Sequence, residues 1–209
     1  MPRRFILGSP HIRLLRRLPR PGRPAARRRE RDRMEAFKGL VQVYTGDGKG
    51  KTTAALGLAL RAAGRGLKVM IVQFMKPPES TGEQFALREL GGRVELRAVG
   101  QPKWLRADRP DPEDVRLAED GLAGARQAML AGALDLLILD EVNVAVHFHL
   151  LRVEDVLELL RDRPDNVEVV LTGRRAALEL IEAADLVTEM RLIKHPYEQG
   201  VQAREGIEF

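Results

Sequence analysis

The chain has 209 residues, 44% of them hydrophobic and 31% charged, a composition typical of one folded domain of ordinary size. It contains no cysteine, which excludes disulfides, thiolate metal sites and cysteine nucleophiles. No stretch approaches the roughly 20 consecutive apolar residues that a membrane helix needs. We therefore expect a cytoplasmic protein without a membrane partner.

Residues 1–33 differ sharply in composition from the remainder. They hold twelve arginines against Glu30 and Asp32, a net charge of +10, whereas residues 34–209 carry −5. An Arg- and Pro-rich segment with so few apolar residues is expected to be disordered. Three interpretations stay open: an arm that binds nucleic acid or membrane surfaces, an organelle-targeting peptide, or translated sequence upstream of a natural start at Met34. We favour the last, and we expect no nucleic-acid binding by the acidic domain at 34–209.

From residue 40 onward, strand-like apolar runs alternate with helix-like segments. The predicted strands are residues 40–44, 69–74, 94–99, 134–139, 167–172 and 186–192. The predicted helices are residues 52–63, 82–90, 112 to about 131, 150–161 and 175–183. Such alternation predicts an α/β fold, with a mostly parallel sheet and helices on both faces.

The loop after the first predicted strand carries the strongest motif. It runs Thr45-Gly46-Asp47-Gly48-Lys49-Gly50-Lys51-Thr52-Thr53 and opens a predicted helix. Glycines let such a backbone turn its N–H groups toward phosphate oxygens, and the helix N-terminus adds a favourable dipole. We predict that residues 45–53 bind nucleotide phosphates, with Lys51 as a point charge and the Thr52 hydroxyl as a ligand of Mg²⁺. The motif departs from G-x-x-x-x-G-K-[ST], because Thr45 replaces the first glycine.

A second motif lies about 90 residues later, where the apolar run Leu136–Leu139 ends in Asp140 and Glu141. Carboxylates at the end of a buried parallel strand emerge at the edge of the sheet where ligands bind. P-loop sites use such a strand end to hold Mg²⁺, so Asp140 and Glu141 are predicted metal ligands. Together the two motifs predict a P-loop NTPase-like (RecA-like) fold.

Several segments along the chain together match the motifs of one known family. They are residues 46–55, Val72-Gln73-Phe74-Met75-Lys76, Leu139-Asp140-Glu141-Val142-Asn143, residues 170–174 and 183–190, Lys194-His195-Pro196-Tyr197-Glu198-Gln199-Gly200, and the final Gly206-Ile207-Glu208-Phe209. This combination resembles the ATP:cob(I)alamin (corrinoid) adenosyltransferases of the CobA/CobO/BtuR type. The resemblance covers about residues 37–209.

The resemblance implies a reaction in which the 5′-deoxyadenosyl group of ATP moves to the Co(I) centre of a reduced corrinoid and triphosphate leaves. It implies cob(I)alamin or cob(I)yrinic acid a,c-diamide as substrate, MgATP (or the Mn²⁺ form) as co-substrate, a homodimer, and a flavoprotein as electron donor for Co(II). Lys49, Lys51 and Glu141 are then the expected catalytic residues. The lysines would neutralise the charge of the departing triphosphate, and Glu141 would hold the Mg²⁺ that does the same. Co(I) is itself a strong nucleophile, so no general base is required.

The resemblance also suggests ligand contacts for three further residues. Arg174 follows a strand end and is expected to face a phosphate or the nucleotide, with a surface salt bridge as the alternative. His195 matches the family ending and is expected near the nucleotide, with a structural turn as the alternative. Trp104 is expected to contact the corrinoid. The family carries Gly-Phe-Thr-Trp there, whereas this chain reads Gly100-Gln101-Pro102-Lys103-Trp104. This difference puts in doubt either how efficiently the enzyme helps Co(II) to be reduced or which corrinoid it uses.

Two other functions remain open at this stage. The first is a P-loop NTPase or kinase that transfers the γ-phosphoryl group and releases ADP. The second is a non-catalytic, nucleotide-gated protein that handles corrinoids, its chemistry lost through the altered loop before Trp104. Release of triphosphate separates the adenosyltransferase from both.

Overall fold

The computed structural model describes residues 38–89, 92–103 and 110–209. Its centre is a six-stranded sheet in which every pair of neighbours is parallel, in the order β3-β2-β4-β5-β1-β6. The strands are β1 (Val41–Thr45), β2 (Val69–Phe74), β3 (Val94–Val99), β4 (Leu136–Asp140), β5 (Glu168–Thr172) and β6 (Leu186–Glu189). The predicted α/β fold with a parallel sheet is therefore confirmed.

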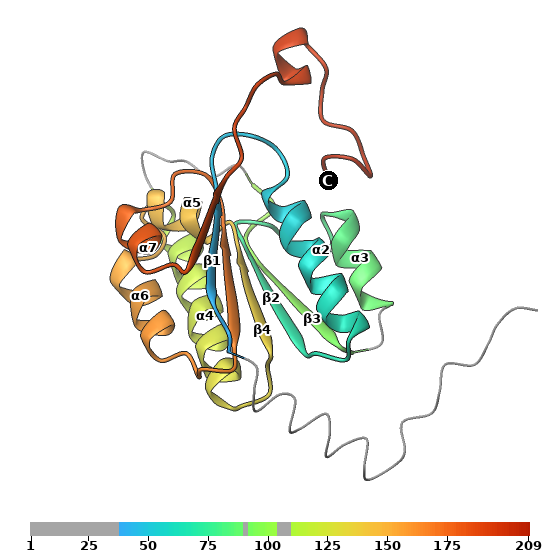
Figure 1. Cartoon of the computed structure of the whole chain (residues 1–209). Helices are drawn as coiled ribbons and strands as arrows, with labels where there is room; N and C mark the ends of the chain where they lie inside the picture. The colour runs from blue at the N-terminus through green and yellow to red at the C-terminus, as the bar shows by residue number, and fades with distance from the viewer. Residues whose placement is uncertain (1–37, 90–91, 104–109) are drawn as a thin grey trace, which may run out of the picture. The chain divides into compact units, whose positions relative to one another are not determined.

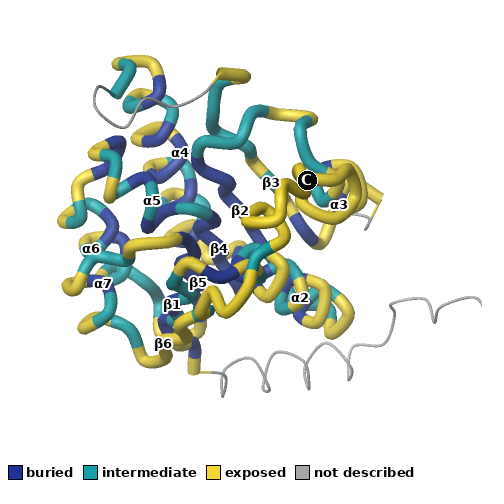
Figure 2. Tube along the Cα trace, turned by 90° about the horizontal axis from the view of Figure 1, so that it is seen from above, coloured by how far each residue is buried: buried dark blue, intermediate teal, exposed yellow. Residues whose placement is uncertain are grey.

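The three central strands, β2, β4 and β5, are buried along almost their whole length (Figure 2). Their sequences VMIVQF, LLILD and EVVLT are nearly continuous apolar runs. A strand covered by helices on both faces needs apolar side chains at successive positions, which explains why these runs do not alternate with polar residues.

Helices cover the two faces unequally (Figure 1). One face carries α2 (Lys51–Gly64) and α3 (Gly82–Arg88), which meet the sheet through Ala55, Ala59 and Leu87. The other face carries α4 (Pro112–Leu130), α5 (Val142–His147), α6 (Val153–Arg161) and α7 (Leu178–Glu182). The alanines of α2 keep that helix close to the sheet, and α2 begins at the edge where the strands end.

Helix α4 begins as its sequence predicts. Asp111 is the N-cap, its side chain accepts a hydrogen bond of 2.8 Å from the Glu113 N–H, and Pro112 occupies the first helical position. Proline fits there because its missing N–H would have no partner within the helix.

Some predicted boundaries differ from the structure, two of them for a local reason that the structure shows. The helix expected at 150–161 begins only at Val153, and the sequence analysis did not predict the short helix α5. The helix expected from residue 175 begins at Leu178, because Arg175 has φ of 56°, a left-handed backbone that no α-helix accepts. The last strand ends at Glu189 instead of residue 192, because Met190 hydrogen-bonds the loop after β1.

The chain after β6 extends beyond the edge of the sheet at which the parallel strands end, and it returns toward the start of α2 (Figure 1). It contains one short 3₁₀-helix, η1 (Pro196–Gln199), and ends with Phe209 beside the loop that follows β1. We call residues 190–209 the C-terminal segment. Within the described ranges, no helix is both long and apolar enough to cross a membrane.

Candidate nucleotide and metal site

The loop between β1 and α2 has the backbone that its glycines allow. Gly46 and Gly50 have φ of 92° and 121°, values that other residues rarely adopt, and α2 begins at Lys51. The N–H groups of the first turn of α2 therefore face the space above the sheet edge, where an anion is favoured.

Two of these glycines have a second role that the sequence analysis missed. A Cβ atom on Gly46 or Gly48 would lie 2.5 or 2.7 Å from the Met190 carbonyl oxygen. The Gly48 N–H donates to that oxygen at 2.6 Å, and the Met190 N–H donates to the Thr45 carbonyl at 2.8 Å. The loop is thus held from behind by the start of the C-terminal segment, and only glycine permits this approach.

Lys51 fixes the shape of the loop. Its side chain is buried, and Nζ donates to the carbonyl oxygens of Gly46 and Gly48, both at 2.7 Å. Burial, with the charge of Arg174, lowers the pKa of Lys51, against the opposing charges of Glu141 and the nearby aspartates. If a phosphate bound here, the Lys51 ammonium could hydrogen-bond to a charged oxygen in place of the two neutral carbonyl oxygens.

Asp140 is the centre of a buried hydrogen-bond network formed where three neighbouring strands end. Its Oδ1 accepts from the hydroxyls of Thr52 (2.8 Å) and Thr172 (2.7 Å). Its Oδ2 accepts from Lys76 Nζ (2.9 Å) and Gln73 Nε2 (3.2 Å). The sheet register creates this network, because Gln73 on β2 lies opposite Asp140 on β4. Asp140 is 1% exposed and has a donor for each of its lone pairs.

Glu141 differs from Asp140 in its backbone conformation and in the hydrogen bonds of its carboxylate. It has φ of 64°, and its N–H donates to the Thr172 hydroxyl at 2.9 Å. Its carboxylate lines the pocket, and none of the described residues donates a hydrogen bond to it. Burial, with the charge of Asp140, raises the pKa of Glu141 above its usual value. A left-handed backbone at a non-glycine residue is an uncommon strain that is often found at functional sites.

The donor set fits a magnesium ion that arrives with a nucleotide. The Thr52 hydroxyl and the Glu141 carboxylate are hard oxygen ligands, and Asp140 hydrogen-bonds the hydroxyl from below. Among the residues that the structure describes, no three His, Cys, Asp or Glu side chains gather into a complete metal cage. Mg²⁺ does not need one, since it commonly takes one or two protein ligands plus phosphate oxygens and water.

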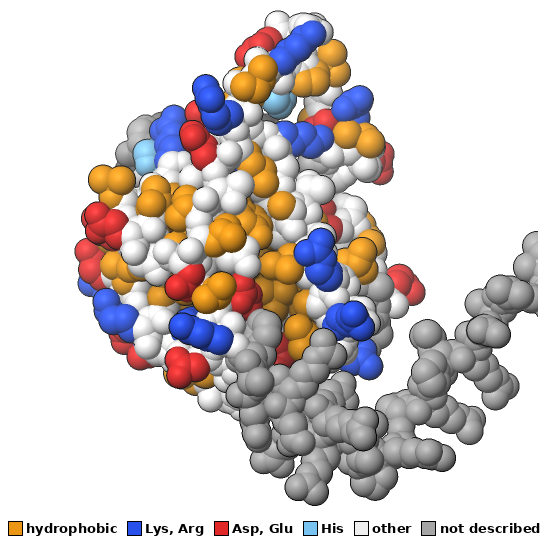
Figure 3. Space-filling model, viewed as in Figure 1, with side chains coloured by type: hydrophobic (Ala, Val, Ile, Leu, Met, Phe, Trp, Pro, Cys, Tyr) orange, Lys and Arg blue, Asp and Glu red, His pale blue; other side chains and the backbone are white. Residues whose placement is uncertain are grey.

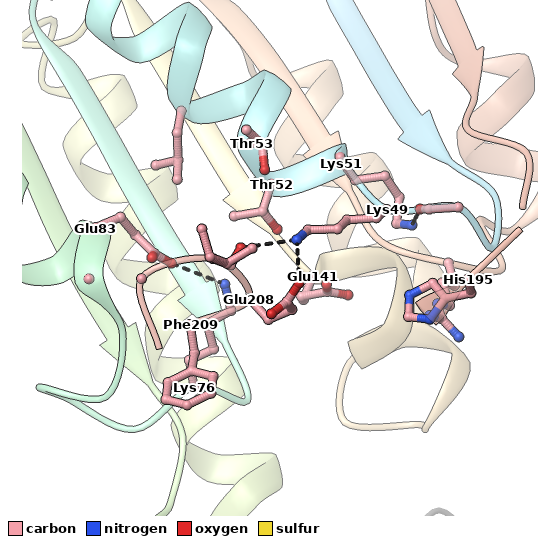
Figure 4. Close-up of a pocket in the computed structure, with 17 residues that line it drawn as sticks. Lys49, Lys51, Thr52, Thr53, Lys76, Glu83, Glu141, His195, Glu208 and Phe209 are labelled. Carbon is pink, nitrogen blue, oxygen red and sulfur yellow. Dashed lines mark hydrogen bonds and ion pairs between the residues drawn. The ribbon is translucent and has the colours of Figure 1, made fainter. Parts of the chain in front are cut away.

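The C-terminal segment covers this site. Lys49 Nζ donates to the Ile207 carbonyl (3.0 Å) and to Glu208 Oε1 (2.9 Å), which brings the last residues over the loop (Figure 4). A pocket of about 470 Å³ lies between them. It is lined by residues 48–53, Leu56, Lys76, Gly82, Glu83, Glu141, Arg174, His195 and residues 206–209.

The structure brings together most, but not all, of the residues predicted from the sequence. Residues 48–53, Glu141, Arg174 and His195 line one pocket, and His195 also accepts a hydrogen bond from the Tyr197 N–H at 3.2 Å. Asp140 lies beneath the pocket. Thr45, Gly46 and Asp47 belong to the loop but do not line the pocket. Trp104 lies outside the described residues.

Sequence reasoning gave no separate role to Lys76, Gln73 or Thr172. Lys76 and Gln73 appeared only inside a segment that matched the family, and Thr172 only as the end of a strand. A common signal was present, because each lies at the end of a buried strand, where side chains face the ligand edge.

The parallel sheet, the glycine loop that opens α2 and the acidic end of β4 define a P-loop NTPase-like protein. Within that class the chain belongs to the ATP:corrinoid adenosyltransferase family, because the model of the family described as "ATP:corrinoid adenosyltransferase BtuR/CobO/CobP" matches residues 37–209.

Individual relatives agree with the family. A corrinoid adenosyltransferase of Pseudomonas aeruginosa is 37% identical over 201 residues, which cover 89% of this chain and 98% of the relative. One of Sinorhizobium sp is 39% identical over 175 residues, covering 82% and 81% of the two chains. One of Escherichia coli K12 is 37% identical over 172 residues, covering 82% and 86%.

Proposed function

We propose that this protein transfers the 5′-deoxyadenosyl group of MgATP to the Co(I) centre of a reduced corrinoid and releases triphosphate, in adenosylcobalamin synthesis or salvage. The observation that carries the proposal is the pocket lined by Lys49, Lys51, Thr52 and Glu141 in a member of this family. The relatives named above are corrinoid adenosyltransferases, which supports the same reaction class.

The chemistry asks the protein for charge stabilisation more than for proton transfer. Co(I) attacks C5′ with its own electron pair, the C5′–O5′ bond breaks, and the bonding pair leaves with the triphosphate. The developing negative charge falls on the phosphate chain, where Lys51, Lys49 and the N–H groups at the start of α2 are available. The fold holds the N–H groups at the start of α2 in place before the reaction, whereas Lys51 and Lys49 exchange their present acceptors for phosphate oxygens when the nucleotide binds.

We assign the metal to Thr52 and Glu141. Mg²⁺ (or Mn²⁺) bound there would supply Lewis-acid neutralisation of the triphosphate. Asp140 acts on the ion through the Thr52 hydroxyl that it holds at 2.8 Å, since both of its oxygens already accept hydrogen bonds from protein donors. Arg174 and His195 complete the polar wall of the pocket and are assigned to the nucleotide.

An anaerobic assay of the full chain with MgATP and chemically reduced cob(I)alamin tests the proposal. Absorbance follows the formation of adenosylcobalamin, and anion-exchange chromatography identifies triphosphate. We expect both products from the wild type, and a loss of at least about a hundredfold in Lys51→Ala, because a charged group is removed from the developing anion.

Lys38→Ala is the matched control, since Lys38 is exposed at the opposite end of β1. It is expected to behave as the wild type. ADP and inorganic phosphate in place of triphosphate would contradict the proposal and identify γ-phosphoryl chemistry. ATP binding without any product would indicate a non-catalytic role or another corrinoid.

We also propose a homodimer, a flavoprotein electron donor and a cytoplasmic location, all of which rest on the family resemblance. Apolar side chains are exposed on the edge strand β6, including Leu186 and Val187, each 42% exposed (Figure 3). Sedimentation equilibrium tests the dimer: a particle of one chain, 23.4 kDa, at micromolar concentration would exclude a stable one.

A further inference from the structure

Lys76 is a charged side chain of the pocket to which no role has been given so far. Its Nζ lies 2.9 Å from Asp140 Oδ2 and 3.4 Å from Glu83 Oε1. It lines the pocket together with Lys49 and Lys51, and in Figure 4 it lies with Glu83 on the side away from His195. The pocket therefore contains three lysines from two segments that are distant in the sequence.

The backbone that presents Lys76 is strained and tightly held. The preceding residue, Met75, has φ of 61°, a left-handed conformation that is costly for a side chain of this kind. A Cβ atom on Gly100 would lie 2.4 Å from the Met75 carbonyl carbon, so the end of β3 packs directly on this turn. The Met75 N–H also donates to the Val99 carbonyl at 3.1 Å. Glu141, at the end of the adjacent strand, is strained in the same way.

A buried amide network supports the far side of the same turn. Gln84 Nε2 donates to Gln73 Oε1 (3.0 Å) and to the Pro77 carbonyl (3.2 Å), while Gln84 Oε1 accepts from the Ser80 N–H (2.9 Å). Gln73 and Gln84 are 0% and 3% exposed. Buried polar groups are costly unless they are satisfied, so this network specifies one conformation for residues 76–81.

Both carboxylates around Lys76 also accept hydrogen bonds from other donors. Asp140 has three other donors, from Thr52, Thr172 and Gln73, and Glu83 accepts from Gln73 Nε2 at 2.9 Å. An ammonium group has three N–H bonds, of which the two carboxylates take two. The third is available to a ligand in the pocket.

Lys76 also keeps its charge in this environment. Burial by itself would lower the pKa of Lys76, but the charge and hydrogen bond of Asp140, with the charges of Glu83 and Glu141, raise it above the usual value. The ion pair with Asp140 at 2.9 Å thus favours the cationic form of Lys76.

We propose that Lys76 is a triphosphate-binding residue, a third cation that donates a hydrogen bond to the phosphate chain from the side opposite Lys51. The proposal rests on the proposed function for the identity of the ligand. The long side chain of Lys76, whose backbone is held at the end of β2, reaches phosphate oxygens that the loop after β1 does not contact. Without a nucleotide, Lys76 stays paired with Asp140 at the end of β4.

The test separates direct contact from charge compensation. Titration calorimetry measures the binding of inorganic tripolyphosphate with Mg²⁺ to the full chain and to the variants Lys76→Met, Lys76→Met/Glu83→Gln and Lys38→Met. Lys76→Met removes the donor and the positive charge that Asp140 and Glu83 share. The double variant removes one charge of each sign, so the charge of the pocket is unchanged while the donor is absent. Circular dichroism checks folding, and the double variant keeps the test available if Lys76→Met alone unfolds.

We expect tripolyphosphate to bind at least about tenfold more weakly to both Lys76 variants, and within about twofold of the wild type to Lys38→Met, because a charged hydrogen bond is lost only in the former. Restoration of wild-type affinity in the double variant would overturn the proposal, since Lys76 would then act only by compensating Glu83. Failure of the wild type to bind tripolyphosphate would overturn it too.

The readout contains no cobalt, so it does not depend on adenosyl transfer. Lys76-dependent binding of tripolyphosphate by a protein that forms no adenosylcobalamin would leave this inference standing and defeat the proposed function. If the protein forms adenosylcobalamin but Lys76→Met binds tripolyphosphate as tightly as the wild type, the proposed function stands and this inference is wrong.

Discussion

Thr172 joins the two acidic residues of the site although it is neither charged nor part of a recognised motif. Its hydroxyl accepts from the Glu141 N–H at 2.9 Å and donates to Asp140 Oδ1 at 2.7 Å, and the side chain is 0% exposed. One hydroxyl thus holds both the strained backbone of Glu141 and the orientation of Asp140.

Thr172→Val keeps the shape of this side chain and removes both hydrogen bonds. We expect a loss of about 1–3 kcal/mol in the free energy of unfolding, because a buried donor and a buried acceptor lose a partner. Urea denaturation measures the loss, and calorimetry should show weaker binding of MgATP. Thr172→Ser, which retains the hydroxyl, is the control; equal stability of the Val and Ser variants would contradict this account.

At the scale of elements, two glycines in different surroundings predict opposite effects. Gly57 lies inside α2, where a Cβ atom would meet nothing within 4 Å apart from the helix's own backbone and the adjoining residues. A Cβ atom on Gly100 would lie 2.4 Å from the Met75 carbonyl carbon. Gly57→Ala should stabilise the protein by about 0.5–1 kcal/mol, because alanine loses less backbone entropy in a helix. Gly100→Ala should destabilise it by about 1–3 kcal/mol, because backbone must move.

Urea unfolding of the two variants measures both effects. Gly100→Ala should in addition weaken tripolyphosphate binding, because it displaces the turn that presents Lys76. A Gly100→Ala variant as stable as the wild type would show that β3 and residues 75–76 are not packed as described.

The last residues of the C-terminal segment contact the loop through Ile207 and Glu208, which both accept hydrogen bonds from Lys49. The Glu208 carboxylate accepts from Arg204 and from Lys49, and these hydrogen bonds lower the pKa of Glu208 to about 2. A lowered carboxyl pKa means that the contact contributes stability above the usual value of 4.5 and loses it as the pH falls toward about 2.

We predict that the last residues stay protected from hydrogen exchange between pH 7 and about 4.5, and lose protection only below that range. Glu208→Gln should remove this pH dependence and expose the segment already at pH 7. The same variant should strengthen tripolyphosphate binding, by no more than about fivefold, because Lys49 no longer has a competing carboxylate. Unchanged exchange in Glu208→Gln would mean that other contacts hold the segment.

At the scale of the whole molecule, the basic charge is separate from the domain that carries the site. Deletion of residues 1–33 removes +10 of charge and no residue of the pocket. We expect the shortened protein to keep its adenosyltransferase activity and to lose any binding to nucleic acid that the full chain shows. Retention on a DNA column against increasing salt measures the second effect, since binding by many arginines is steeply salt-dependent. A shortened protein without activity would show that residues 1–33 contribute to the site.

The sequence by itself determined the class of fold and much of the loop. Short apolar runs such as those of β2 and β4 are typical of strands buried on both faces, and their alternation with helices predicts parallel pairing. The glycines of the loop predicted a backbone that turns its N–H groups toward phosphate, and Gly46 and Gly50 have the positive φ that few other residues adopt. The roles given to individual site residues, including Trp104, stay predictions.

Only the tertiary structure decided how residues distant in the chain meet. Local composition does not reveal that β5 lies between β1 and β4, that the register places Gln73 beside Asp140, or that Met190 packs behind the loop. These contacts depend on the order of the strands and on the path of the C-terminal segment, which arise from packing across the whole sheet. Lys76 is an example. Its place after a buried strand could be read from the sequence, but the strained turn, the close approach by Gly100 and the buried amide network that hold it could not.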